Sequence, residues 1–295
     1  MQLIQSAILF PTAPHARYLT FDLKAGVDTA TISASLKSLS TQTDGQYLLI
    51  GIGVPLVSAL GCSIPDLREF PRELRMGDSQ PAAALWCWLR GDERGELWQR
   101  GHELTALLQS AFILRQCVDG FTHRGGHDLT GFQDGTENPK GNAAVATAIV
   151  GKTAPDGLHG SSFVAVQQWL HQWATFNAMS KTDQDNAIGR ERVSNDELED
   201  APESAHVKRT AQESFEPEAF VVRRSMPWTN GDEGGLMFTS FGHNLDGFEV
   251  QWRRMLGLDD GIKDALFQFS EPMTHDYFWC PPMLEGHLDL RALGL

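Results

Sequence analysis

Apolar residues gather in short runs along this chain, and polar, glycine-rich or proline-containing segments separate the runs. In the first half such runs predict strands at 6–10, 47–53, 84–91 and 113–121. Apolar positions spaced three and four residues apart predict helices at 29–39 and 97–112. The expected order is therefore strand, helix, strand, strand, helix, strand.

The second half repeats this order. Its pattern predicts strands at 161–173, 219–228, 235–242 and 277–282, a polar helix and loop at 183–199, and a helix at 245–256. Two successive sets of this kind predict an α+β fold with two ferredoxin-like halves, each an antiparallel sheet with helices on one face. The turn-rich stretch 131–141 marks the junction, so we expect domains at 1–140 and 141–295.

Charge and composition narrow the choice of partners. The 295 residues carry 24 Lys and Arg against 38 Asp and Glu, a net charge of −14, which argues against nucleic acid or an anionic membrane as the main partner. No stretch approaches the roughly 18 apolar residues of a membrane span, and the N-terminus lacks a basic signal-peptide region. The four cysteines are scattered and form no CxxC pair. These features predict a cytoplasmic protein with reduced cysteines.

Several patterns that suggest chemistry fail on inspection. His102 would need a second histidine four residues later for a zinc-protease helix, and Ala106 stands there. The segment 123–128 (His-Arg-Gly-Gly-His-Asp) contains metal-binding residue types, but its two glycines favour a simple loop. Cys280 and Pro281 resemble a haem-thiolate dipeptide, yet the simpler interpretation is a strand that proline ends.

One further segment says more about function than the patterns above. Residues 131–139 read Gly-Phe-Gln-Asp-Gly-Thr-Glu-Asn-Pro, a turn by pattern alone. The segment also resembles the GxxDG region of the dye-decolourising peroxidases, haem enzymes with two ferredoxin-like domains. Three further segments follow in the family's order: Ala-His-Val-Lys-Arg at 205–209, Val-Arg-Arg-Ser-Met-Pro at 222–227, and Lys-Asp-Ala-Leu at 263–266. The resemblance covers essentially the whole chain and implies one non-covalent haem b per chain, held in the C-terminal half.

The resemblance implies roles for the residues around the iron. His206 matches the proximal iron ligand. The fourth segment resembles the family's C-terminal helix, whose acidic residue would accept a hydrogen bond from the His206 imidazole. We favour Asp264 for that partner, with Asp260 as the alternative. Arg209, Glu137 and Asn138 are further expected haem contacts; for the propionates the candidates are Arg209 and backbone amides of 136–138.

On the opposite side of the iron the resemblance implies Asp134 as general base and then general acid toward H2O2. Arg223 matches the cation that stabilises charge on the departing oxygen. Ser225 lies two residues further along the predicted strand, hence on the same face, and would hold a water molecule. Arg224 points the other way by the same phase, so we expect a surface charge or an ion pair there.

These expectations lead to a haem peroxidase that reduces H2O2 and oxidises organic donors such as dyes and phenols by one-electron steps. A homo-oligomer is expected. Whether the protein is packaged into a protein compartment is left open. One alternative is a haem carrier, or a protein that releases iron from porphyrin, on the same fold. Another is a haem-free ferredoxin-like dimer that binds a small aromatic ligand.

Overall fold

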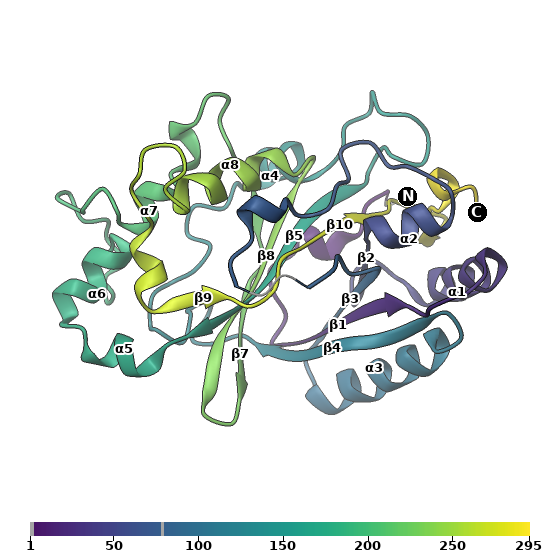
Figure 1. The fold of residues 1–295 in the computed structure, drawn as a ribbon, viewed down its shortest axis with the longest axis horizontal. Coiled ribbons are helices and arrows are strands. Elements are labelled where there is room, and N and C mark those ends of the chain that lie inside the picture. Colours follow the sequence, from purple (N-terminus) through teal and green to yellow (C-terminus); the bar gives the residue numbers. More distant parts are fainter. Residues whose placement is uncertain (1–2, 78–79) are drawn as a thin grey trace.

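Ten of the described strands form one antiparallel sheet that closes on itself, and the last two form a separate pair (Figure 1). We describe residues 3–77 and 80–295 from a computed structural model. Eight strands follow the order β8-β7-β4-β1-β3-β2-β10-β5, and β5 pairs again with β8. The predicted α+β class with antiparallel strands is confirmed, but the strands of both halves belong to one barrel instead of two separate sheets.

The first half supplies four neighbouring strands in the order β4-β1-β3-β2. Helices α1 and α3 bury Leu36, Leu39, Leu97 and Leu104 against one face of these strands. The predicted helices and the last three predicted strands of this half are confirmed to within a few residues. The elements are β1 (His15–Leu23), α1 (Thr29–Gln42), β2 (Leu48–Ile52), α2 (Val54–Ala59), β3 (Leu85–Gly91), α3 (Arg94–Leu108) and β4 (Phe112–Phe121).

The predicted strand at 6–10 is wrong. Ser6–Ile8 form a short 3-10 helix, and the first strand is β1, which runs between β3 and β4. Pro11 and Pro14 follow the apolar run directly, and proline lacks the N–H that a ladder needs. Ile8 instead fills one end of the barrel core.

The second half supplies the order β10-β5-β8-β7. The strand predicted at 219–228 splits into β6 and β7, which pair with successive parts of β8. The elements are α4 (Gly141–Ala148), β5 (Ser162–His171), α5 (Trp173–Ala178), α6 (Lys181–Ile188), α7 (His206–Arg209), β6 (Val222–Arg223), β7 (Met226–Asn230), β8 (Glu233–Gly242), α8 (Asp246–Met255), β9 (Ser270–Pro272), β10 (Asp276–Cys280), β11 (Met283–Leu284) and β12 (His287–Leu288).

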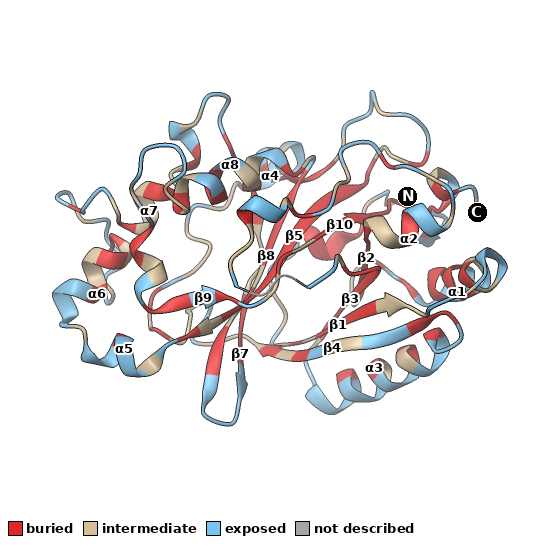
Figure 2. Ribbon diagram, in the orientation of Figure 1, coloured by how far each residue is buried: buried red, intermediate tan, exposed pale blue. Residues whose placement is uncertain are grey.

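The two halves meet at narrow seams. Strands β2 and β10 pair only at Ile52 and Trp279, and β4 and β7 pair only at Gly120 and Trp228. Stacked aromatic rings fill the barrel between the seams: Tyr18, Trp86, Trp88, Phe241 and Phe278. Figure 2 shows this buried centre, with exposed helix faces around it. A cofactor site must therefore lie outside the barrel.

Helices α5 to α8 lie at the end of the molecule opposite α1 and α3 (Figure 1). They face the outer side of β5 and β8, where Trp169 and Phe238 belong to a second apolar cluster with Phe248 and Trp252 of α8. None of the described helices is long and apolar enough to cross a membrane.

Candidate active site

A cavity of about 890 Å³ lies between the outer face of β5 and β8 and the helices α6 to α8. Aromatic and aliphatic side chains make most of its wall: Phe132, Trp169, Ile188, Leu236, Phe238, Phe248, Trp252, Met255, Leu266 and Phe269. Among the few polar groups in the same wall are Asp134, His206 and Arg223. Together with Leu266 they show that the fold brings together residues from all four sequence segments.

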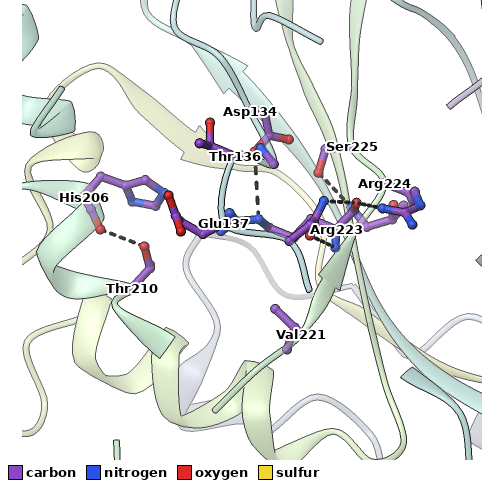
Figure 3. Close-up of polar contacts among 12 residues, drawn as sticks. Asp134, Thr136, Glu137, His206, Thr210, Val221, Arg223, Arg224 and Ser225 are labelled. Carbon is purple, nitrogen blue, oxygen red and sulfur yellow. Dashed lines mark hydrogen bonds and ion pairs between the residues drawn. The ribbon is translucent and has the colours of Figure 1, made fainter. Parts of the chain in front are cut away.

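His206 begins α7 and turns its imidazole toward the side of the cavity where Asp134 and Arg223 lie (Figure 3). Its Nδ1 donates a hydrogen bond of 2.8 Å to Oδ2 of Asp264, whose side chain is fully buried. A buried carboxylate accepts but does not donate, so the proton of the neutral ring is on Nδ1. Nε2 therefore keeps a free lone pair, which is the form that binds a metal ion.

The position of Asp264 follows from its place at a helix start. Asp264 caps the short 3-10 helix Ala265–Gln268, and its Oδ1 accepts the N–H of Leu266 at 2.8 Å. It does not sit within the helix predicted by the resemblance. Asp260, the alternative partner, forms a two-pronged ion pair with Arg209 at 2.7 Å and does not contact His206.

Asp134 lies in a tight loop between β4 and α4. Its N–H donates to the carbonyl of Gly126, and its Oδ1 accepts the N–H of Gly135 at 2.7 Å. Gly135 has a φ of 72°, a conformation that L-residues rarely adopt, so the Asp-Gly turn needs glycine there. The same Oδ1 lies 4.0 Å from Nε of Arg223. The second carboxylate oxygen of Asp134, Oδ2, makes no hydrogen bond among the described residues.

Arg223 ends β6, where it pairs with Ser240 of β8. Asn138 holds its backbone on both sides: the Arg223 N–H donates to Oδ1 of Asn138, and Nδ2 of Asn138 donates to the Arg223 carbonyl. Nε of Arg223 is buried and has no hydrogen-bond partner in the described chain. An unpaired buried donor is costly, so this nitrogen is suited to a bound ligand.

Arg224 turns away from Arg223 as the strand phase predicted, but the surroundings of Arg224 and of Ser225 differ from the expectation. Arg224 donates to the carbonyl of Leu9; burial and the nearby Arg90 lower its pKa to about 10. It is therefore neither a surface charge nor part of an ion pair. Ser225 lies between β6 and β7, where it lines a small separate cavity with Asp134 and does not line the main one. The interruption of the strand causes this difference.

The three other expected haem contacts, Arg209, Glu137 and Asn138, lie in different surroundings. Arg209 lines neither of the two largest cavities, because its guanidinium is taken up by Asp260 and by the carbonyl of Arg254. Arg209 as a haem contact stays a prediction, and its pairing with Asp260 does not favour it. Glu137 is largely exposed and pairs with Arg190 at 2.8 Å. Asn138 contacts the backbone of Arg223, as described above, and lines neither cavity.

A second, more polar cavity of about 790 Å³ adjoins the first. Both cavities share Gln133, Asp134, Ile188, His206, Thr210 and Arg223 in their walls. Arg190 adds a buried guanidinium there, which also contacts Glu197 at 3.2 Å. The combined space is thus apolar on one side and polar on the other, with His206, Asp134 and Arg223 at the boundary.

One group in the cavity wall was missed by the sequence analysis. His171, at the end of β5, contacts Asp128 through Nε2 at 3.1 Å and Ser270 through Nδ1 at 2.8 Å. Burial raises the pKa of Asp128, but hydrogen bonds from His171 and Thr130 outweigh burial, so the net shift is downward. The only sequence signal was Asp128 in the 123–128 segment, which we interpreted as a loop.

Comparisons with known proteins agree with this geometry. A sequence profile described as "Dyp-type peroxidase, C-terminal" matches residues 126–285. A dye-decolorizing peroxidase of Mycolicibacterium paratuberculosis is 29% identical over 93% of this chain and 82% of its own length. One from Rhodococcus erythropolis is 28% identical over 94% and 86%.

Solved structures give the same result. A putative Dyp-type peroxidase of Shewanella oneidensis superposes with a TM-score of 0.81 at 27% identity, over 99% of this chain and 97% of its own. A DypB variant of Rhodococcus jostii, in complex with heme, gives a TM-score of 0.80 at 26% identity over 93% and 95%. Because the profile covers more than half of the chain, the chain belongs to the dye-decolourising peroxidase family.

Proposed function

We propose that this protein is a haem b peroxidase that reduces H2O2 and oxidises organic donors, such as dyes and phenols, one electron at a time. The observation that carries the proposal is His206: its Nδ1–H is held by a fully buried carboxylate, and its ring faces an apolar cavity that also contains Asp134 and Arg223. Family membership and the heme in the related DypB structures support the same conclusion.

The cavity fits a haem group in its chemistry. Aromatic and aliphatic walls suit the macrocycle, and the adjoining polar cavity suits its carboxylates. His206 would hold the iron through Nε2, with Asp264 fixing the ring and making it a stronger electron donor. Haem bound there would supply the iron that exchanges electrons with peroxide and with the donor.

The chain's own residues would handle the proton and the charge. Asp134 takes the proton from one oxygen of H2O2 and returns it to the other, and the free Oδ2 is the atom that carries it. Arg223 adds a fixed positive charge with an unpaired N–H beside the departing oxygen. Ser225 approaches Asp134 from the small cavity, where its hydroxyl can hold water.

Other parts of the chain would support this site. Asn138 positions Arg223, and Arg190 with the backbone amides of 136–138 is favoured over Arg209 for the haem carboxylates. The two runs β4-β1-β3-β2 and β10-β5-β8-β7 have equivalent strand orders, which supports two ferredoxin-like halves with a boundary at 140/141. A homo-oligomer belongs to the same proposal.

The test is the absorbance spectrum of the haem-reconstituted protein before and after H2O2. We expect a Soret band for wild type, its loss or displacement in His206→Ala, and no change in His102→Ala, a control on the exposed face of α3. A wild type without a Soret band would overturn every haem proposal. A haem protein whose reaction with H2O2 is unaffected by Asp134→Asn and Arg223→Leu would instead be a carrier or an iron-releasing protein.

A further inference from the structure

The strand that carries Arg223, β6, has only two residues and pairs only with β8 among the described strands. The outer edge of such a strand leaves backbone N–H and C=O groups without partners in the sheet. Strands usually have about 3–10 residues, so the two residue pairs of β6 fix it weakly. The position of Arg223 must therefore depend on contacts from outside the sheet.

Two side chains supply such contacts at the backbone carbonyl of Arg223. Nδ2 of Asn138 donates to this carbonyl at 2.9 Å, and so does Nη1 of Arg224, also at 2.9 Å (Figure 3). Nη2 of the same Arg224 guanidinium donates to the carbonyl of Leu9 at 2.8 Å. A guanidinium carries its donors in a rigid planar fork, so it can hold two acceptors at fixed positions. Arg224 thus joins the backbone of Arg223 to the N-terminal segment.

The N-terminal segment 5–11 is itself firmly held, which makes Leu9 a fixed point. The side chain of Gln5 is fully buried and bonds the backbone of Ile50 in both directions. Its Nε2 donates to the Ile50 carbonyl at 3.0 Å, and its Oε1 accepts the Ile50 N–H at 2.8 Å. Ile8 is packed into the barrel core. These contacts anchor the segment independently of the guanidinium.

Arg224 is costly to keep in this place. It is mostly buried, and in the described part of the chain no carboxylate lies within ion-pair distance of it; burial and the positive charge of Arg90 both lower its pKa. An apolar side chain of similar size would fill the same space without this cost. What only the arginine provides is the bridge between the two carbonyls. The bridge therefore explains the guanidinium better than packing does.

We propose that Arg224 is a positioning residue: by bridging the Arg223 carbonyl to Leu9, it fixes the peptide after Arg223 and so directs the Arg223 side chain toward Asp134. The proposal rests on the proposed peroxidase function and adds a residue to it. Nε of Arg223 lies 4.0 Å from Oδ1 of Asp134 and has no hydrogen-bond partner in the described chain, so it does not hold this direction by itself. Arg224 lines neither of the two largest cavities and acts only through Arg223.

The experiment measures equilibrium binding of fluoride to the ferric haem-loaded protein by the change in absorbance. Fluoride is a small anion that accepts hydrogen bonds, so its affinity reports whether the Arg223 guanidinium points into the site. We expect Arg223→Leu to weaken fluoride binding by about 10- to 100-fold, the contribution of a hydrogen bond to a charged group. Arg224→Gln keeps Arg223 but removes the bridge. It should weaken binding by about tenfold and slow the first spectral change after H2O2 by a similar factor.

Two controls separate positioning from general destabilisation. In a protein that already carries Arg223→Leu, Arg224→Gln should change fluoride binding no further, because the guanidinium that it positions is absent. Arg90→Gln removes another buried guanidinium, which donates to the carbonyls of Ala7 and Pro11 but does not contact Arg223. This variant should bind fluoride as wild type does.

Arg224→Lys covers the case in which Arg224→Gln does not fold. Lysine keeps the positive charge but lacks the planar fork, so we expect the same loss of fluoride affinity. Unchanged affinity in Arg223→Leu or in the Arg224 variant, an equal loss with and without Arg223, or an equal loss in Arg90→Gln would each overturn the positioning role. In all these cases wild type still binds haem and fluoride, so the proposed haem binding survives. A wild type that binds no haem would instead refute the proposed function.

Discussion

Replacing Asp264 by asparagine tests how the proposed haem ligand is held. In wild type the two carboxylate oxygens of Asp264 accept from two different donors, Nδ1–H of His206 and the N–H of Leu266, each at 2.8 Å. Asparagine has nearly the same shape but only one accepting oxygen. Whichever way the amide is turned, its NH2 group faces a donor, so one of the two hydrogen bonds is lost.

The size of the effect follows from the burial. The carboxylate has no exposed side-chain surface, and an unsatisfied buried donor costs about 1–3 kcal/mol. If the ring instead moves its proton to Nε2, that nitrogen can no longer bind iron. At about 1.4 kcal/mol for each tenfold change, we expect haem affinity to fall by about 10- to 100-fold, as for other partners of metal-binding histidines.

The assay is transfer of haem from the protein to excess apomyoglobin, followed at the Soret band. Asp264→Asn should release haem about 10- to 100-fold faster than wild type. Asp260→Asn is the matched control, because Asp260 pairs with Arg209 and does not contact His206. The iron–histidine vibration should also shift in Asp264→Asn alone.

Equal haem release by wild type and Asp264→Asn would refute this reasoning, since the hydrogen bond would then contribute nothing to ligation. Equal acceleration by Asp260→Asn would show that the effect comes from general destabilisation of the segment 255–268.

Three other predictions concern the distal residues and one buried histidine. Asp134→Asn and Arg223→Leu should keep the Soret band but slow the first spectral change after H2O2 by about 10²–10⁴-fold, measured by stopped flow; a normal rate in either variant would remove that residue from the proton step. Asn138→Ala breaks two hydrogen bonds to the Arg223 backbone, so it should lower the free energy of unfolding by about 1–3 kcal/mol and slow the same step, and normal values of both would contradict its positioning role. Burial, and to a smaller extent Arg75, lowers the pKa of His275 from 6.5 to about 4. The folded protein thus keeps this ring neutral while the unfolded chain protonates it, so the stability that depends on it is complete above about pH 6.5 and is lost as the pH falls to about 4. Between these limits wild type should lose about 3 kcal/mol more than His275→Gln in guanidinium unfolding, and parallel pH profiles would count against the shift.

Local patterns were enough to predict most elements. The apolar runs that became β2, β3, β4, β5 and β8 are short and continuous, and the helical spacing of α1, α3 and α8 is regular. They depend mainly on neighbours within a few residues, because a strand or helix buries one face whatever its partner is. The strand prediction for the segment 6–10 failed because Ala7 and Ile8 pack into the barrel core from a short 3-10 helix, which no local pattern describes.

The candidate residues were found through four short segments of the sequence, and their arrangement came only from the fold. The sequence placed His206, Asp134 and Arg223 up to 89 positions apart and left Asp260 and Asp264 as alternatives. The helix start at Ala265 and the ion pair of Asp260 with Arg209 separate these two carboxylates, and both depend on packing between α7 and α8.

The closure of the barrel and the cavities around Asp134 were decided by tertiary structure alone. Strand order depends on pairings between segments far apart in the chain, such as β2 with β10, and one residue pair makes that seam. The His171–Asp128 contact and the small cavity join residues from β5, β7, β8 and the loop 122–134 in the same way. Sequence periodicity indicates which face of an element is buried. It does not indicate which distant element covers that face, because the free energy of that contact depends on both partners.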